Sequence, residues 1–353
     1  MGKYTAIDDP SAYFQTALYT GNAGFNTITN DGNSDLAPDF IWGKCRSTTK
    51  THFLYDTTRG AEKRLESDNT GVEDTGTNGI LNFYTDGFRT ASGNTENDNG
   101  ESYVAWQWKC NGGTTSSNTD GDITSTVQVN QDAGFSIMTY SGTTGDVHTI
   151  GHGLGVTPDV WIVKQRSGNS EFQDWFFWHH QMAASNIIDN RMLFLNTTAA
   201  LATYTGINAV TSSTIRVKSS TTAQNGDTYV AYAFAEKQGY SKFGKYVSNG
   251  NADGPFVYTG FKPAFVIIKS ADAAKPWVMK TAAISENPIN EILYPNLTNA
   301  EGSDGLIDFV SNGFKVREGP DANINNSLSG TYIYMAFAEN PFVTSTGIMG
   351  TAR

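Results

Sequence analysis

The segment TYVAYAFAE at residues 228–236 returns as TYIYMAFAE at residues 331–339, and a looser copy, SYVAWQW, fills residues 102–108. Aromatic and small residues alternate along these copies, which is the period-2 pattern of a β-strand. Three copies of one strand in a chain of 353 residues indicate three related units. Triplication favours building or binding over catalysis, because an enzyme needs one good site and not three similar ones.

A second landmark keeps the same order in each unit: a proline followed by an apolar strand that ends in lysine. The copies are PDFIWGK at residues 38–44, PDVWIVK at 158–164 and PAFVIIK at 263–269. Their prolines lie 120 and 105 residues apart, so each unit is domain-sized rather than a short solenoid turn. The unbroken apolar runs predict strands that are covered on both faces.

These patterns predict an all-β protein of three tandem antiparallel β-sandwich domains, with jelly-roll or lectin-like topology, arranged in a row. The low content of charged residues, 17%, argues against long helices. The expected boundaries are 1–110 for the first domain, 111–133 for a linker or long loop, 134–238 for the second domain, 239–343 for the third and 344–353 for a tail. The predicted core contains Ile41, Trp106, Trp108, Val160, Ile162, Val230, Phe234, Val266, Ile268, Ile333 and Phe337.

The two junctions between units differ in composition. The stretch NGGTTSSNTDG at residues 111–121 predicts a flexible linker, whereas Glu236 is followed almost at once by the first strand of the third unit. We therefore expect the second and third units to pack as a fixed pair and the first to move more freely. Short helical turns are expected at most within residues 182–188 and 282–293.

Charge and cysteine content exclude several classes of protein. A net charge of −11 with no basic run excludes a nucleic-acid partner. The only two cysteines, Cys45 and Cys110, each end a predicted strand, so a disulfide between them is one alternative. Two cysteines in a large chain make no disulfide framework, and the interpretation that we favour is free, partly buried thiols. The sequence has no apolar run of about 20 residues and no signal peptide, which predicts a soluble protein made in a cytoplasm, with no membrane insertion.

Several longer strings carry a resemblance to a known group of proteins. The strings are GHGLGVTP at residues 151–158, YVAYAFAE at 229–236, GYSKFGKY at 239–246, NADGPFVYTGF at 251–261, YTAIDDPSAYF at 4–14 and GTAR at 350–353. They resemble a repeat of structural proteins from marine tailed bacteriophages, especially those of cyanobacteria and other ocean bacteria. The resemblance covers essentially the whole chain and implies a virion component of the loosely defined tail-fibre or lectin-like kind. It carries over no catalytic or binding residue, and the first unit departs most from the pattern.

Histidines give little support for a metal or catalytic site. His152 in the GHGLG string has no counterpart in the other units and no second ligand at metal-binding spacing, so we interpret it as a turn-stabilising residue. The pair His179 and His180 follows an aromatic run, and adjacent strand residues point oppositely. We expect one of the two in the core and the other at the rim.

Carboxylates and motifs point the same way. The DGD and NADG stretches at residues 120–122 and 251–254 lack the spaced ligands of a calcium loop and predict hairpin turns. A glycosidase needs two carboxylates that face each other across a groove, and nothing in the sequence pairs the acidic residues in this way. No nucleophile elbow, phosphate loop or dinucleotide fingerprint is present. We therefore expect no enzyme activity, no cofactor, no metal and no catalytic residue. The acidic residues that a glycosidase reading would use are Asp56, Asp86, Glu66, Asp304 and Asp308.

Tryptophans offer the candidate glycan contacts. Trp175, Trp178 and Trp277 follow the proline-led strands, and such rings stack on sugars when they are exposed. The alternative is that aligned tryptophans mark shared core packing, and this is the interpretation that we favour.

The leading functional hypothesis is a non-enzymatic bacteriophage structural protein, associated with the tail fibre or tail tip. A capsid-decorating protein or head fibre is the alternative within that class, a glycan-binding host-attachment module is a second class, and a polysaccharide depolymerase is the third. The sequence lacks heptads and collagen-like triplets, so the expected partners are other virion proteins or further copies of the chain, with a host surface glycan as a further candidate. Because residues 1–110 diverge most, we expect them to anchor the protein to the virion, with residues 134–343 projecting outward.

Overall fold

Strands make up almost all of the regular structure. The computed structural model describes residues 5–76, 78–93, 95–168, 172–182, 191–204, 210–317, 323–325 and 328–350. Within these ranges, the only helical elements are two short 3₁₀ turns, η1 (Pro10–Ala12) and η2 (His180–Met182), and every strand pairing in a named sheet is antiparallel. The predicted all-β class is confirmed.

Each unit, which we call repeat 1, 2 or 3 in chain order, contributes a four-stranded inner sheet with the same strand order. The unit's first strand lies beside its last, which lies beside the proline-led strand and then the next strand. In repeat 1 these strands are β1 (Phe14–Thr20), β9 (Ser102–Trp108), β3 (Phe40–Cys45) and β4 (Phe53–Asp56). In repeat 2 they are β12 (Phe135–Ser141), β19 (Thr228–Phe234), β14 (Val160–Ser167) and β15 (Phe176–His179), and in repeat 3 they are β20 (Ser241–Asn249), β27 (Leu328–Pro341), β22 (Phe261–Ser270) and β23 (Val278–Thr281).

A smaller outer sheet accompanies each inner sheet. In repeat 1 it consists of β2 (Asn26–Ile28), β8 (Gly87–Thr90) and β7 (Ile80–Tyr84), with a separate pair β5 (Lys63–Arg64) and β6 (Asp74–Thr75). In repeat 2 it consists of β13 (Val147–Gly151) and β18 (Thr214–Lys218), and in repeat 3 of β21 (Phe256–Tyr258), β26 (Gly313–Val316), β25 (Gly302–Val310) and β24 (Ile289–Ile292). The inner sheet of repeat 2 is wider, because β11 (Ser125–Asn130) and β10 (Ser116–Asn118) extend one edge and β16 (Arg191–Phe194) and β17 (Ala202–Thr203) the other.

A stacked tyrosine pair marks the same register in all three inner sheets. The first and last strands of each repeat place two tyrosines opposite each other, with ring centroids 4.9 to 5.3 Å apart. The equivalent pairs are Tyr19 with Tyr103, Tyr140 with Tyr229, and Tyr246 with Tyr332. The sequence repeat is therefore also a structural repeat, and the positions of the three units can be compared residue by residue.

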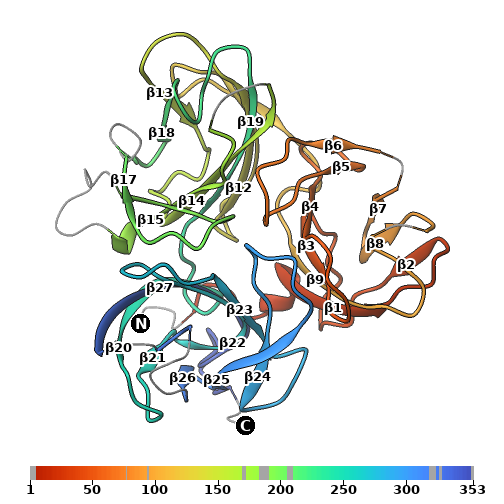
Figure 1. The fold of residues 1–353 in the computed structure, drawn as a ribbon, viewed down its shortest axis with the longest axis vertical. Helices are drawn as coiled ribbons and strands as arrows, with labels where there is room; N and C mark the ends of the chain where they lie inside the picture. Colours follow the sequence, from red (N-terminus) through yellow and green to blue (C-terminus); the bar gives the residue numbers. More distant parts are fainter. Residues whose placement is uncertain are drawn as a thin grey trace.

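The three inner sheets meet face to face around one centre, so the repeats form a closed ring and not a row (Figure 1). Aromatic contacts join every pair of repeats: Phe40 lies 4.7 Å from Tyr232, Phe234 lies 5.9 Å from Phe337, and Phe14 lies 5.4 Å from Phe337. The expected linear arrangement was wrong because the proline-led strands are apolar on both faces, and the second face needs another repeat to cover it.

The predicted linker is part of the fold. Residues 111–133 contain β10 and β11, and β11 pairs with β12 from Thr126 to Asn130. Repeat 1 itself packs against both other repeats, through Phe40 on Tyr232 and Phe14 on Phe337, so it does not stand apart as expected. The short helix expected within residues 282–293 was also wrong, since this segment forms a turn followed by β24. The helix expected within residues 182–188 falls mostly outside the described residues.

Burial agrees with the sequence prediction at every core position that was named. All eleven predicted core residues are at most 6% exposed. Cys45 and Cys110 are free, as expected, and both are fully buried.

Candidate functional site

One set of hydrogen bonds recurs at all three junctions between repeats. The lysine that ends each proline-led strand is buried and reaches a threonine carbonyl of the neighbouring repeat. Each ammonium also donates to carbonyls near its own strand. Burial lowers the pKa of Lys44 to about 8, that of Lys164 to about 7 and that of Lys269 to about 8. The contacts are Lys44 Nζ to Thr298 O at 3.1 Å, Lys164 Nζ to Thr70 O at 2.8 Å and Lys269 Nζ to Thr198 O at 3.3 Å.

A ring nitrogen makes a second recurrent bond four residues before the equivalent threonine. It comes from His52 in repeat 1, from Trp175 in repeat 2 and from Trp277 in repeat 3. His52 Nδ1 accepts the Trp42 indole N–H at 3.0 Å, so its Nε2 carries the proton and donates across the junction. The bonds run to Tyr294 O at 2.9 Å, to Glu66 O at 2.8 Å and to Phe194 O at 2.9 Å, which makes the ring close: repeat 1 donates to 3, repeat 3 to 2, and repeat 2 to 1.

The three tryptophans that were predicted as candidate glycan contacts are all buried. Trp175, Trp178 and Trp277 are 0%, 5% and 1% exposed. None of the three presents a ring face to solvent, so they do not form a sugar-stacking surface. Two of them are instead the junction donors just described, which is why tryptophan recurs at the same position in two repeats.

Two of the three junctions are filled by a polar pair beside the proline. Asp39 accepts a hydrogen bond from Thr57 Oγ1 at 2.6 Å, and Asp159 lies 3.4 Å from His180 Nδ1. In repeat 3 both positions are alanine, Ala264 and Ala282. The equivalence is fixed by the main chain, because the second residue of each pair donates its N–H to the carbonyl of the first at 2.8 to 2.9 Å.

The wall that repeat 1 contributes to the junction with repeat 3 also carries a smaller side chain than its equivalents. The register of the tyrosine pairs aligns Thr16 of β1 with Ile137 of β12 and Phe243 of β20. Ile137 and Phe243 are at most 1% exposed and fill their junctions. Thr16 is smaller, and its Oγ1 atom is buried without a hydrogen-bond partner. Three small residues therefore coincide where repeat 3 meets repeat 1.

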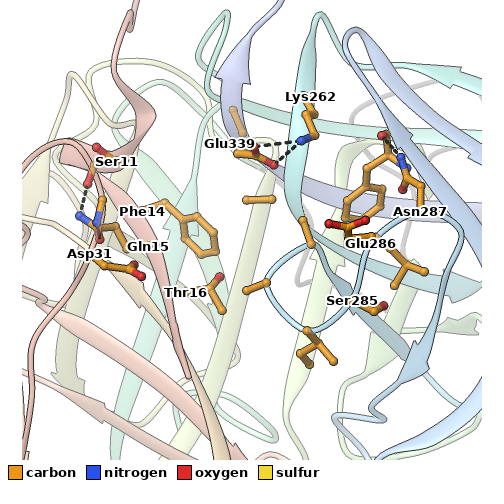
Figure 2. Close-up of a pocket in the computed structure, with 18 residues that line it drawn as sticks. Ser11, Phe14, Gln15, Thr16, Asp31, Lys262, Ser285, Glu286, Asn287 and Glu339 are labelled. Carbon is orange, nitrogen blue, oxygen red and sulfur yellow. Dashed lines mark hydrogen bonds and ion pairs between the residues drawn. The ribbon is translucent and has the colours of Figure 1, made fainter. Parts of the chain in front are cut away.

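The result is a cleft of about 850 Å³ between repeats 1 and 3 (Figure 2). Figure 2 shows Phe14 and Thr16 on the wall formed by repeat 1, and Ser285, Glu286 and Asn287 on the wall formed by repeat 3. Phe309 and Ile289 contribute apolar floor. This is the candidate functional site, because three residues that are smaller than their equivalents in the other repeats meet here and break the internal symmetry of the described residues.

Charges at the rim of the cleft are mainly acidic. Lys262 forms an ion pair with Glu339 at 2.9 Å, while Asp31 and Glu286 add two further carboxylates. Gln15 is held in place, since its amide donates to Ser11 O and Ser34 O, so the wall of repeat 1 is fixed. A cleft with an apolar floor and an acidic rim suits an uncharged or basic ligand.

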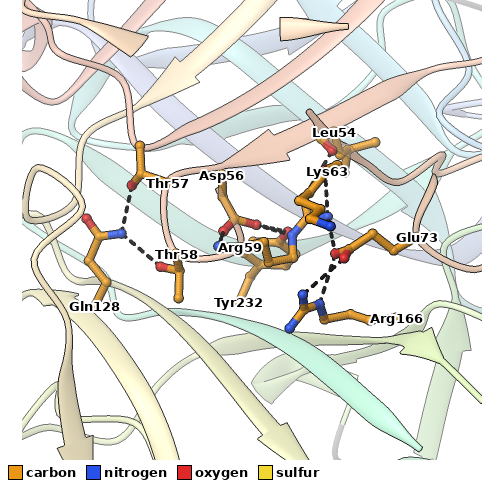
Figure 3. A network of polar contacts seen from close by, with 10 residues as sticks. All are labelled: Leu54, Asp56, Thr57, Thr58, Arg59, Lys63, Glu73, Gln128, Arg166 and Tyr232. Atoms are coloured by element: carbon orange, nitrogen blue, oxygen red, sulfur yellow. Dashed lines mark hydrogen bonds and ion pairs between the residues drawn. The ribbon is translucent and has the colours of Figure 1, made fainter. Parts of the chain in front are cut away.

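The junction of repeats 1 and 2 holds a buried ionic network instead of a cleft (Figure 3). Arg59 forms ion pairs with Asp56 and Glu73. The guanidinium of Arg166, in repeat 2, donates two hydrogen bonds to the Glu73 carboxylate, of 2.9 and 3.0 Å. Tyr232 donates to Asp56 at 2.8 Å. Burial acts to lower the pKa of Arg59, but the adjacent Asp56 carboxylate outweighs it and raises that pKa well above the ordinary value. All these groups have partners, so the network is structural and Asp56 is no exposed acid.

The histidines and acidic turns have structural roles. His152 is buried, and its Nδ1 accepts the Leu154 N–H at 3.1 Å, which is the expected turn-stabilising role. His179 is buried and His180 is half-buried, as expected. Asp122 accepts bonds from Thr149 and lies 2.7 Å from His148. Among the described residues, no group of three or more histidine, cysteine or acidic side chains is placed to hold a metal ion.

Sequence reasoning missed the cleft, although one signal was visible. The aspartate after the proline in two repeats is alanine in the third, as the strings PDF, PDV and PAF show. The meaning of that change depends on the ring, which brings Thr16 opposite the two alanines. The recurrent lysine marks the end of a strand in the sequence, and its role at the junction depends on the neighbouring repeat that supplies the threonine carbonyl.

Comparison with known proteins assigns the chain to a family whose function is not known. The chain belongs to the family described as Domain of unknown function (DUF7483), whose model matches residues 9–341. No curated protein and no solved structure matches the chain. In the part of the chain that the structure describes, no helix combines the length and apolar character that crossing a membrane requires.

Proposed function

We propose that this protein is a non-enzymatic structural component of a bacteriophage particle, associated with the tail fibre or tail tip. The observation that carries the proposal is the ring itself: three domain-sized repeats are locked by equivalent hydrogen bonds into one body. In this ring the buried histidines, lysines and ion pairs are used in packing. The resemblance of the sequence strings to phage structural proteins supports the same class.

At the level of fold, we propose that each inner sheet and its outer sheet form one β-sandwich of jelly-roll or lectin-like type. Separate apolar clusters support two of these sandwiches, one between the two sheets of repeat 1 and one between those of repeat 3. The core of repeat 2 merges with the central cluster.

Placement on the particle is tested by immunogold labelling of intact virions. Label on the tail is the expected result. Label confined to heads would replace the tail assignment with the alternative, a capsid-decorating protein or head fibre, for which a compact acidic protein is equally suitable.

The protein needs a partner to become part of a particle, either another virion protein or further copies of itself. We propose that repeat 1 supplies the anchor, because it departs most from the common pattern. Its surface exposes Phe25, which is 60% exposed and lies under the Arg89 guanidinium at 4.5 Å. Phe25→Asp is expected to reduce incorporation into particles, whereas Val247→Asp, at an apolar site in repeat 3 that is 55% exposed, is expected to leave it unchanged.

Glycan binding during host attachment is the second candidate, and one observation favours it. On β21 of repeat 3, Phe256 and Tyr258 are 49% and 59% exposed and point to the same side of the strand. Binding of the purified protein to host cells, compared with Tyr258→Ala, tests this role. Loss of binding in that variant supports it, and absence of binding by the folded wild type removes it. A depolymerase, the third candidate, is tested by a reducing-end assay on host polysaccharide.

A further inference from the structure

We propose that the cleft between repeats 1 and 3 accepts an extended polypeptide strand, which adds to the free edge of β1. This inference names a binding site and an occupant that the particle assignment does not supply. It does not depend on where in a virion the protein is located.

The edge of β1 has main-chain groups available for such a strand. Lys109 donates to Tyr13 O at 2.9 Å and Gly21 donates to Glu101 O at 2.8 Å, so the odd-numbered residues of β1 bond to β9. The N–H and C=O groups of Thr16 and Leu18 consequently point away from β9. Within the described residues, no hydrogen bond reaches these main-chain groups. Leu18 is also 42% exposed, so a strand added at this edge would cover apolar surface.

Repeat 2 shows the occupied form of the same edge. Its strand β12, which is equivalent to β1, carries β11 as an added strand, with Gln128 opposite Ile137. Gln128 fills the junction of repeats 1 and 2, because its Nε2 donates to Thr57 Oγ1 at 2.9 Å and to Thr58 Oγ1 at 2.8 Å. The chain therefore already contains one example of strand addition at this position.

The truncated residues prepare the edge of β1 for an equivalent strand. In the junction of repeats 3 and 1, Ala282 replaces Thr57 and Ala264 replaces Asp39, which leaves room for the side chain that lies opposite Thr16. The orphaned Thr16 Oγ1 needs a hydrogen-bond partner, and a glutamine at the place of Gln128 would supply one. The expected occupant is an extended segment that alternates polar and apolar residues, as β11 does.

The probe is a synthetic, end-blocked peptide with the sequence of residues 124–131, TSTVQVNQ, labelled for fluorescence anisotropy. We expect saturable binding to the full-length protein. Methylation of the peptide nitrogen at the position of Gln128 removes the donor that faces β1 and is expected to weaken binding about tenfold. Equal binding of the methylated peptide would show that no strand is added.

Two variants refill the cleft with residues taken from the other repeats, so they are expected to fold. Thr16→Phe, which installs the residue that repeat 3 has at this position (Phe243), and the double variant Ala264→Asp with Ala282→His are each expected to weaken peptide binding at least about tenfold. Thr27→Phe, at an exposed site on β2, is the matched control and should bind as the wild type does. The proposal is overturned if the peptide fails to bind the wild type, or if Thr16→Phe binds it equally well.

A second copy of the chain is the other occupant that the same edge allows. Light scattering over a range of protein concentrations distinguishes the two cases. A dimer that Thr16→Phe abolishes and that the peptide does not displace would assign the edge to self-association and contradict the proposal. Failure of peptide binding would leave the immunogold result, and with it the virion assignment, unaffected.

Discussion

The buried lysines are the residues on which the junctions depend most directly. Lys164 Nζ donates to Gln173 O at 2.6 Å within repeat 2 and to Thr70 O of repeat 1. Lys164→Met keeps the length and apolar stem of the side chain but leaves both carbonyls without this donor. We expect a loss of about 2 kcal/mol or more in the free energy of unfolding, measured by urea denaturation. Lys245→Met, at an exposed position of β20, is the control and should change stability by less than about 0.5 kcal/mol.

Acid should weaken the junction between repeats 1 and 3. Burial, with a smaller contribution from the nearby Lys44, lowers the pKa of His52 to about 3. In the unfolded chain a histidine titrates near 6.5, so between pH 6.5 and 3 the unfolded state binds more protons than the folded state. Stability contributed by neutral His52 is therefore complete above about pH 6.5 and is lost as the pH falls, by about 1.4 kcal/mol per pH unit.

The variant His52→Trp isolates this contribution, because Trp175 and Trp277 occupy the same position in the other repeats. The indole N–H can still donate to Tyr294 O, but no group titrates. We expect the unfolding free energy of the variant to fall less steeply between pH 6.5 and 4.5 than that of the wild type. Parallel pH profiles of the two proteins would show that His52 is already accessible to protons in the folded state.

At the scale of elements, the segment 111–133 fills the junction between repeats 1 and 2 and bonds to both sides of it. Gln128 of β11 accepts from the main-chain N–H groups of Asn111 and Gly113, in addition to its two threonine bonds. Gln128→Ala removes all four interactions at a buried site. We expect a loss of about 2–4 kcal/mol in unfolding free energy.

Gln131→Ala is the matched control for this prediction, because Gln131 is exposed and makes one bond, to Gly153 O at 2.9 Å. It should cost less than about 1 kcal/mol in the same denaturation experiment. If both glutamine variants lose the same free energy of unfolding, the contacts of Gln128 do not stabilise the junction between repeats 1 and 2.

The elements predictable from the sequence were those whose pattern is local. Period-2 alternation and unbroken apolar runs identified the strands and the core, and the repeated segments identified three units. The composition of residues 111–121 predicted a flexible linker, and this prediction was wrong. Glycine, serine and asparagine are typical of linkers, but they suit equally well the tight turns that flank β10. Tertiary pairing of β11 with β12 overrides that local signal, and no local pattern reports it. The cleft could not be predicted either, because Thr16 and Ala264 are far apart in sequence and meet only when the ring closes.

At the scale of the whole molecule, the shared central core should make the three repeats unfold together. Each inner sheet has one face covered by its own repeat and the other by the remaining two, so no repeat keeps a complete core alone. We expect a single transition in scanning calorimetry, with a calorimetric enthalpy equal to the van't Hoff enthalpy. Two or three separate transitions would mean that the repeats are independent domains in contact.

The same geometry changes what deletion of repeat 1 should do. A sequence read as three domains in a row predicts that removing residues 1–110 leaves a folded two-domain fragment. In the ring, the deletion uncovers the face on which Phe40 contacts Phe135 at 6.1 Å and Trp106 contacts Phe265 at 5.1 Å. It also removes the carbonyl that accepts the indole N–H of Trp175.

We therefore expect the fragment 111–353 to lose fixed tertiary packing. Its near-ultraviolet circular dichroism should collapse while far-ultraviolet β-signal remains, and it should bind a hydrophobic dye that the full chain does not bind. Adding the separately produced segment 1–110 should restore the near-ultraviolet signal if the two parts reassemble through the junctions. A fragment that is monomeric, dye-negative and native-like in its near-ultraviolet spectrum would show that repeats 2 and 3 hold a complete core without repeat 1, and the ring would then be packing between domains rather than one cooperative fold.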